Sequence, residues 1–139
     1  MHRIKGEEEP ETESMRYAQE IKDHMALRNR QDTFFDWALL GPGIDGHTAS
    51  LFPGQEKTLN TSNLCEGTWH SGTNQTRITL TPVIIRRSTC TTHHVLGEQK
   101  ADIVSALVLK PEQNKNYPAT NISGEWYLDK AAAYGLIQS

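Results

Sequence analysis

The sequence FFDWALLGPGIDGHTASLFPG, residues 34–54, decides the fold. It begins with a short, nearly continuous apolar run over 34–40 and passes into a glycine-dense loop over 41–46. An apolar run of this length, stopped by Gly-Pro-Gly, favours a buried strand of a parallel sheet. We therefore expect Trp37 to lie in the core, and residues 48–52 to form a short helical turn after the loop.

Outward from this stretch, helical and extended patterns alternate along the chain. A helical pattern begins at Thr12, with Thr12 or Ser14 as its cap, and its apolar residues recur at i, i+4 spacing: Tyr17, Ala18, Ile21 and Met25. Residues 77–81 alternate as a strand does, a weaker strand spans 90–96, and a clear helix follows Gly97. This order predicts an α/β domain with a mainly parallel sheet.

Three other segments give weaker patterns. Residues 55–75 are rich in Ser, Thr, Asn and Gly without periodicity, which predicts a long loop. The alanine-rich segment 126–136 predicts a helix, in which Trp126 and Tyr127 serve packing. The strand over 90–96 is polar for a central strand, which indicates an edge position or a locally weakened core.

Composition and charge limit the class of protein. The 139 residues are 36% hydrophobic and 22% charged, as expected of one globular domain. A net charge of −3 and the absence of any Lys/Arg-rich run argue against a nucleic-acid partner. The sequence has no apolar membrane span, and residues 1–9 lack the apolar segment of a signal peptide, so we expect a cytoplasmic location. Cys65 and Cys90 are expected to be free thiols.

The loop after the predicted strand carries the candidate chemistry. In open α/β sheets, ligands bind at the carboxyl ends of the strands. Glycines such as Gly43 and Gly46 let a ligand approach the backbone closely. A turn at Gly46 sets the carboxylate of Asp45 near the imidazole of His47, the natural general base at neutral pH. From spacing alone, a capping Asp45 and a surface His47 remain the alternatives.

A resemblance to a known family bears on this choice. The run Gly-x-Gly-x-Asp-Gly-His-Thr-Ala-Ser-Leu-Phe-Pro, residues 41–53, resembles a motif of the 6-phosphogluconolactonase family. Later blocks resemble the family's later blocks in the same order: residues 77–81, 97–101, 117–119 and 126–129. The resemblance covers essentially all of the chain.

The resemblance implies a Rossmann-like fold, a mainly parallel sheet flanked by helices, and the hydrolysis of a small sugar-phosphate lactone. The family reaction converts 6-phosphoglucono-1,5-lactone to 6-phosphogluconate in the oxidative pentose phosphate pathway. His47 would act as general base on water, a role that contributes typically ~10²–10⁴-fold. Asp45 would orient the imidazole. Backbone N–H groups around Gly43 and Gly46 are candidates for holding the developing oxyanion.

The phosphate of such a substrate requires cations. Lys100 stands just inside a helix start after Gly97, where its charge and the helix amides converge. The resemblance also places a phosphate-binding lysine there. Arg77, at the head of its strand, is the second candidate, and a solvated surface charge is the alternative for both residues.

No cofactor and no metal site are expected. The pair His93-His94 is the one sequence feature that suggests metal ligands. Adjacent residues on a strand point to opposite faces, and no cysteine or carboxylate cluster completes a ligand set for that pair.

The resemblance also implies that residues 1–139 are the C-terminal portion of a single family domain, truncated at the N-terminus. Family members carry, ahead of this region, a βαβ portion with a phosphate loop rich in Ser, Gly and Thr, and an Asp-Glu-Arg segment. The alternative function is therefore a non-catalytic remnant or half-domain that binds a sugar phosphate or a partner. An incomplete sheet leaves an open edge and an uncovered apolar face, which favour self-association.

A third candidate is a glucosamine-6-phosphate deaminase. Those enzymes belong to the same superfamily and also carry Asp-Gly-His, followed by Asn-Glu-Pro with a catalytic glutamate. Here Leu51-Phe52-Pro53 occupies the corresponding place. Phe52 cannot transfer protons, so the resemblance favours the lactonase over the deaminase.

Overall fold

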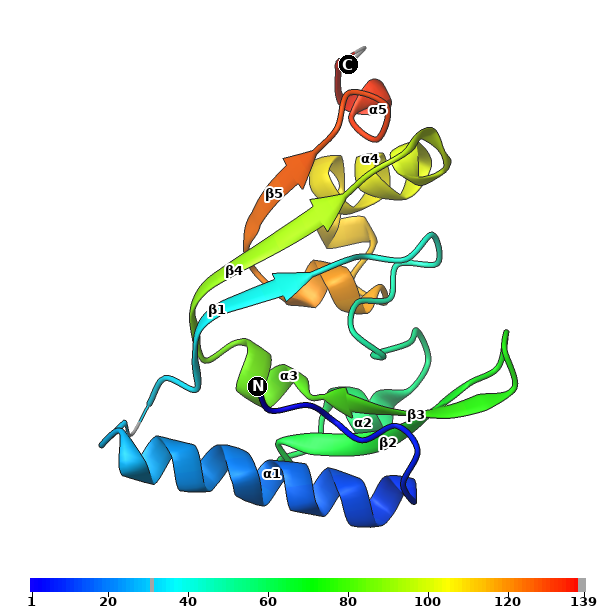
Figure 1. The fold of residues 1–139 in the computed structure, drawn as a ribbon. Helices are drawn as coiled ribbons and strands as arrows, with labels where there is room; N and C mark the ends of the chain where they lie inside the picture. Colours follow the sequence, from blue (N-terminus) through cyan, green and yellow to red (C-terminus); the bar gives the residue numbers. More distant parts are fainter. Residues whose placement is uncertain (31, 138–139) are drawn as a thin grey trace.

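A parallel sheet and an antiparallel hairpin organise the chain (Figure 1), and the computed structural model describes residues 1–30 and 32–137. The helices are α1 (Pro10–Leu27), α2 (Glu56–Leu59), α3 (Pro82–Ile85), α4 (Ala101–Leu109) and α5 (Tyr134–Ile137), with 3₁₀ turns η1 (Glu98–Lys100), η2 (Pro111–Gln113) and η3 (Pro118–Asn121). The strands are β1 (Phe35–Leu40), β2 (Cys65–His70), β3 (Gln75–Leu80), β4 (Ser88–Val95) and β5 (Glu125–Leu128).

The parallel sheet has the strand order β1-β4-β5, which confirms the predicted α/β class. The polar strand β4 is central, so the expectation of an edge position was wrong. Several of its polar groups have partners, whereas Ser88 Oγ and His93 Nδ1 are buried without a hydrogen-bond partner among the described residues, which fits the predicted alternative of a locally weakened core. Trp37 Nε1 donates to Thr92 Oγ1 at 2.8 Å, and His93 Nε2 lies 3.0 Å from the Ile122 carbonyl oxygen.

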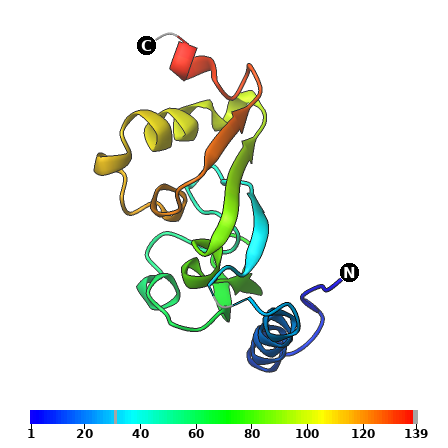
Figure 2. The same cartoon turned by 90° about the vertical axis from the view of Figure 1, so that its left-hand side faces the viewer.

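The two faces of this sheet have different surroundings. On the inner face, Val95 packs against Val104 of α4 and against Ala132. On the outer face, none of the described helices lies in front of the strands (Figure 2). Trp37 is 61% exposed and Leu39 is 63% exposed. The prediction that Trp37 lies in the core was therefore wrong, because no other described element covers this face.

The neighbouring histidines of β4 follow the alternation of a strand. His93 is fully buried on the inner face, where it stacks on Trp126 with ring centroids 4.4 Å apart. His94 is exposed and stacks on Tyr127 of β5 at 5.0 Å. The two side chains belong to opposite faces, as strand geometry requires.

Helix α1 begins two residues earlier than predicted. Glu9 caps it, because its carboxylate accepts the backbone N–H groups of Glu11 and Thr12. Pro10 then occupies the first turn, where a missing N–H costs nothing. Thr12 and Ser14 are therefore not the cap. Of the predicted apolar stripe, its C-terminal members Ile21 and Met25 are buried.

Three segments differ from the sequence prediction. The predicted loop 55–75 contains α2, all of β2 and the start of β3, and β2 and β3 pair as a hairpin over 65–80. The predicted helix 126–136 starts instead as strand β5, which pairs with β4, and only α5 is helical. Residues 48–52 form a turn closed by a bridge between Thr48 and Leu51, not a helical turn.

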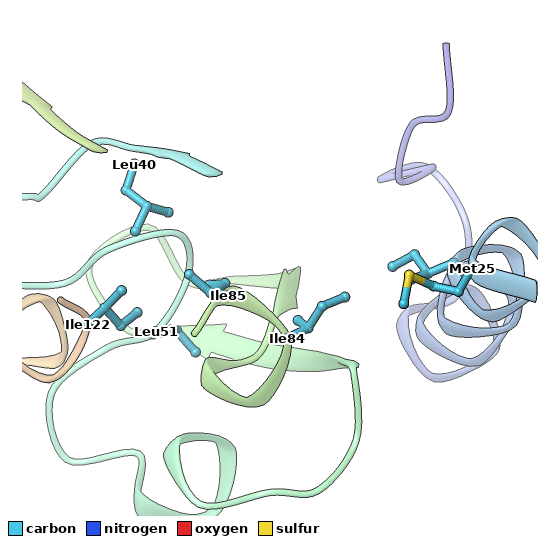
Figure 3. Close-up of a cluster of buried hydrophobic side chains, with 7 residues drawn as sticks. Met25, Leu40, Leu51, Ile84, Ile85 and Ile122 are labelled. Atoms are coloured by element: carbon cyan, nitrogen blue, oxygen red, sulfur yellow. The ribbon is translucent and has the colours of Figure 1, made fainter. Parts of the chain in front are cut away.

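A buried apolar cluster fixes the site loop to the rest of the fold. It joins α1, β1, the loop after β1 and the short helix α3 (Figure 3), through Ile21, Met25, Leu40, Leu51, Ile84, Ile85 and Ile122. Leu51 is completely buried, so the C-terminal end of loop 41–53 is held by packing. Among the described helices, none has the length and apolar character needed to cross a membrane.

Candidate active site

Loop 41–53 leaves the carboxyl end of β1 and closes on itself. The N–H of Gly43 donates to the His47 carbonyl at 2.8 Å, and the N–H of Gly46 donates to the Gly43 carbonyl at 3.0 Å. The loop is also tied to η3, because Ala119 N–H donates to the Gly46 carbonyl at 3.1 Å. Gly46 has φ +78° and lies against the Tyr117 ring, where a Cβ atom would overlap that ring.

The turn brings Asp45 and His47 into contact. Oδ1 of Asp45 lies 2.5 Å from Nδ1 of His47 and 3.3 Å from its backbone nitrogen. Since an ionised carboxylate only accepts, Nδ1 carries the proton and Nε2 of the neutral ring is left as an acceptor. A Cβ atom at Gly43 would overlap the His47 ring, so glycine is required beneath the pair.

The Asp45 carboxyl stays ionised at neutral pH. Partial burial raises its pKa, but hydrogen bonds from the His47 side chain and backbone outweigh that effect, so the pKa lies below its usual value. An ionised Asp45 accepts from Nδ1 and so holds the imidazole in one orientation.

A buried aromatic ring joins this pair to the hairpin. The ring of Phe52 is 5.0 Å from that of His47 and 4.5 Å from that of His70, at the end of β2. The guanidinium of Arg77, on β3, lies 5.9 Å from the Phe52 centroid. The structure thus places Arg77 and His47 on the same aromatic side chain, although they are thirty residues apart.

His70 also belongs to this cluster, although no sequence pattern points to it. Residues 55–75 have no periodicity, so nothing in the sequence places His70 beside the loop. The hairpin brings it within 6.4 Å of His47, measured between ring centroids. Thr73 N–H donates to Nδ1 of His70 at 2.9 Å, and this contact fixes the ring at the hairpin turn.

Lys100 contacts the same loop at its N-terminal end, away from the hairpin. It lies at the end of η1, directly before α4, and its Nζ donates to the Pro42 carbonyl at 2.5 Å. Pro42 is fully buried and precedes Gly43 in the chain. Four of the six predicted site residues lie in loop 41–53, and the other two contact it: Lys100 at Pro42 and Arg77 at Phe52.

One expectation about the loop requires correction. The N–H groups of Gly43 and Gly46 are both donated to carbonyl oxygens inside the loop. Neither is available to hold an oxyanion in this structure. The lack of a side chain at Gly43 leaves room for the His47 ring, and at Gly46 for the Tyr117 ring. Contact between these two glycines and the substrate stays a prediction.

Comparisons with known proteins agree with this geometry. The family described as "Glucosamine-6-phosphate isomerases/6-phosphogluconolactonase" matches residues 1–128. The 6-phosphogluconolactonase of Haemophilus influenzae is 42% identical over 137 residues, which are 95% of this chain and 56% of that protein.

Solved structures give the same result. The crystal structure of a protein called devB has a TM-score of 0.84 and 37% identity, and the match covers 96% of this chain and 57% of that one. The 6-phosphogluconolactonase of Trypanosoma brucei has a TM-score of 0.70 and 26% identity, over 93% of this chain and 56% of that one. The chain spans about half the length of the curated relatives it matches. It belongs to the family of glucosamine-6-phosphate isomerases and 6-phosphogluconolactonases.

Proposed function

We propose that this chain carries the catalytic residues of a 6-phosphogluconolactonase, which hydrolyses 6-phosphoglucono-1,5-lactone to 6-phosphogluconate in the oxidative pentose phosphate pathway. The observation that carries the proposal is the Asp45–His47 pair, 2.5 Å apart in a loop that follows a parallel strand. The substrate is taken from the printed names of the relatives.

In the proposed mechanism, Nε2 of His47 removes a proton from water as the water oxygen bonds to the lactone carbonyl carbon. The tetrahedral intermediate then collapses, and the bond between this carbon and the ring oxygen breaks. The imidazolium returns its proton to that ring oxygen, which leaves the open-chain acid. Asp45 keeps Nδ1–H in place throughout and stabilises the imidazolium. A positioned general base supplies typically ~10²–10⁴-fold.

Two cations serve the substrate's phosphate in this proposal. The ammonium of Lys100 has three N–H donors, and the Pro42 carbonyl takes one of them. Two donors are left for an anion beside the loop. Arg77 approaches from β3 over Phe52 and is the second cation. We propose the cytoplasm as the place of the reaction, as expected of an enzyme of sugar-phosphate metabolism such as its bacterial relatives.

The environment of Phe52 favours the lactonase over the deaminase. Its ring is 6% exposed and packs 5.0 Å from the His47 ring. A deaminase of this superfamily needs a glutamate to transfer protons at the corresponding place. A buried aromatic ring supplies no such group, whereas ester hydrolysis requires only the base and water.

The test is hydrolysis of freshly generated 6-phosphoglucono-1,5-lactone by the purified chain. We expect a rate above the spontaneous one, lost in His47→Ala and kept in His94→Ala, which removes a histidine from the outer sheet face. Lys100→Ala should raise KM with a smaller change in kcat. Equal rates of hydrolysis for His47→Ala and the unchanged chain would contradict the assignment of His47 as the general base.

A second candidate function rests on the outer face of the sheet. Trp37, Leu39 and Tyr127 are all more than half exposed there. Strand β1 pairs, within the described residues, only with β4, so its other edge is open. An exposed apolar face beside an open edge favours association. We infer that the chain is a half-domain that self-associates through this face, whether or not it is catalytic alone.

Self-association is tested by the mass of the chain in solution over a range of concentrations. We expect the mass to rise with concentration above the 15.6 kDa of one chain. The double variant Trp37→Ser, Leu39→Ser should stay at that mass. A concentration-independent monomer in both proteins would exclude self-association, and a monomer without lactonase activity would identify a non-catalytic remnant.

A further inference from the structure

Three potential metal ligands converge where the N-terminal segment crosses α1. They are Nδ1 of His2, a carboxylate oxygen of Glu20 and Nε2 of His24, all within 4.8 Å of one another. The two ring nitrogens are 3.3 Å apart, and Nδ1 of His2 also contacts the Glu20 carboxylate. We propose that these three side chains bind one divalent transition-metal ion, Zn²⁺ foremost.

The two imidazole donors already have the spacing that a small tetrahedral ion requires, and the Glu20 oxygen, in direct contact with His2, would move outward to admit the ion. Zn²⁺ binds imidazole nitrogen at ~2.0–2.1 Å, so two donors on a tetrahedral ion lie about 3.4 Å apart. The nitrogen pair of His2 and His24 is already at 3.3 Å. Glu20 and His24 are four residues apart on α1 and therefore share one face of the helix.

The N-terminal segment is tied to α1, which presents His2 to the other two ligands. Lys5 N–H donates to Glu13 Oε1 at 2.7 Å. Arg16 Nη2 donates to the Arg3 carbonyl at 3.3 Å. The Tyr17 hydroxyl donates to the carbonyl of His2 itself at 3.4 Å. These contacts hold the segment across the helix without a metal, so the three ligands are positioned in advance.

The carboxylate ligand also has an outer partner. Arg16 contacts Oε2 of Glu20, while Oε1 is the oxygen that faces His2. Hydrogen bonds to the outer atom of a metal ligand fix its orientation and are typical of metal sites. Arg16 is in turn held by Glu13, at 2.6 Å and 2.7 Å.

The donor set selects the class of ion. Two imidazoles and one carboxylate suit Zn²⁺, Ni²⁺, Co²⁺ or Cu²⁺, whereas Mg²⁺ and Ca²⁺ prefer all-oxygen sites. His2 is exposed and the other two ligands are half-buried, so a fourth position is open to water. None of the ligands comes from loop 41–53. The ion would therefore act as a clip between the N-terminal segment and α1.

No sequence pattern points to this group, because His2 and Glu20 are separated by eighteen residues. The adjacent pair His93-His94 is more conspicuous in the sequence, yet its side chains lie on opposite faces of β4. Glu20 and His24 read as ordinary polar residues of an amphipathic helix. The site exists only because the N-terminal segment folds back along α1 (Figure 1).

The test is a calorimetric titration of the purified chain with ZnCl₂, together with thermal unfolding at each ratio. We expect one ion per chain at the site and a Tm that rises with Zn²⁺. His2→Gln and His24→Gln should each raise Kd at least about tenfold. His70→Gln, which alters a histidine near the catalytic loop, is the matched control and should leave Kd unchanged.

Co²⁺ supplies a second readout, since its visible absorption reports imidazole and carboxylate coordination. A Co²⁺ spectrum that is lost in His24→Gln and kept in His70→Gln supports the site. Circular dichroism checks that the variants keep their helices. An absence of binding by the unchanged chain would overturn the proposal. Binding that survives His24→Gln and disappears in His70→Gln would overturn it as well, because the ion would then belong to the catalytic loop.

Discussion

The inner and outer faces of the β1-β4-β5 sheet differ strongly in how far their side chains are exposed to solvent. Neighbouring leucines of β1 show the contrast: Leu40, on the inner side, is 8% exposed, and Leu39, on the outer side, is 63% exposed. The inner face is a packed core beneath α4 and the site loop. The outer face carries large hydrophobic side chains, as a core does, but they are exposed to solvent. One side of the sheet is packed, and no described element covers the other.

The outer face is nevertheless ordered by its own polar contacts. Thr92 Oγ1 lies 2.8 Å from the Trp37 indole nitrogen and 3.2 Å from Nε2 of His94. The Tyr127 hydroxyl donates to Glu125 at 3.0 Å. The first contact joins β1 to β4, and the other two lie within β4 and within β5, while the apolar surfaces face solvent. The site at the edge of the sheet does not depend on these contacts, since its residues pack on the inner side.

The largest expected effect uses the two leucines as a matched pair. Leu40→Ala should lower the free energy of unfolding by roughly 2–5 kcal/mol, because it leaves a cavity in the core of Figure 3. Leu39→Ala should change it by less than about 0.5 kcal/mol. Urea denaturation of both variants at low protein concentration measures the difference. Equal losses would mean that the outer face is covered in solution.

A second prediction compares two glycines to test whether the site loop is as tightly packed as the inner face. Gly46 and Gly54 both have positive φ, at +78° and +80°. Alanine costs about 1 kcal/mol in backbone strain at either position. At Gly46 the new Cβ also overlaps the Tyr117 ring, which adds roughly 1–3 kcal/mol. Nothing lies within 4 Å of a Cβ atom at Gly54.

Thermal or chemical denaturation of Gly46→Ala and Gly54→Ala checks this second prediction, and the lactonase assay accompanies it. We expect the extra loss only at Gly46, together with lower activity. Identical stabilities would show that Tyr117 moves aside without cost, and that the loop is less tightly packed than the inner face.

The smallest expected effect is on the pH dependence of the free energy of unfolding, and it distinguishes the two histidines of β4. Burial lowers the pKa of His93 below 6.5, and its contact with the Ile122 carbonyl offsets this only in part. The unfolded chain therefore binds a proton that the folded chain does not. Stability present above pH 6.5 is lost as pH falls toward the folded pKa, with a slope of at most about 1.4 kcal/mol per pH unit.

Urea denaturation between pH 5.5 and 7.5 measures that slope. His93→Gln keeps a donor for Ile122 but no longer titrates, so we expect a flatter profile. His94→Gln, on the outer face, should leave the profile unchanged. If the His93 and His94 variants gave the same slope, burial of the inner face would not be its cause.

Local pattern was enough to predict three of the elements around the site, but not the turn over 48–52 or the hairpin. The apolar run of β1, the glycine-rich loop and the helix after Gly97 all lie where the sequence indicated. The contact of Asp45 with His47 follows from their spacing and the turn at Gly46. Such features depend on neighbours within a few residues, and so they are visible in the sequence.

Features set by distant neighbours were not visible. Trp126 and Tyr127 precede an alanine-rich run, yet pairing with β4 overrides helix propensity there. The hairpin strand β2 has no apolar alternation, because its buried positions include Thr68 rather than aliphatic residues. The exposure of Trp37 depends on which described elements pack over the sheet. No pattern within residues 34–40 shows that none of them covers this face.

The outer face also carries its own chemical reporter. Cys90 is exposed and pairs in register with Trp37, whereas Cys65 is buried, and burial raises its pKa to about 12. A thiol reagent at neutral pH therefore modifies Cys90 and spares Cys65. The labelling rate of this one sulfur follows how much of the outer face is shielded, for example by a second copy of the chain. Cys90 thus reports any covering of this face without an introduced probe.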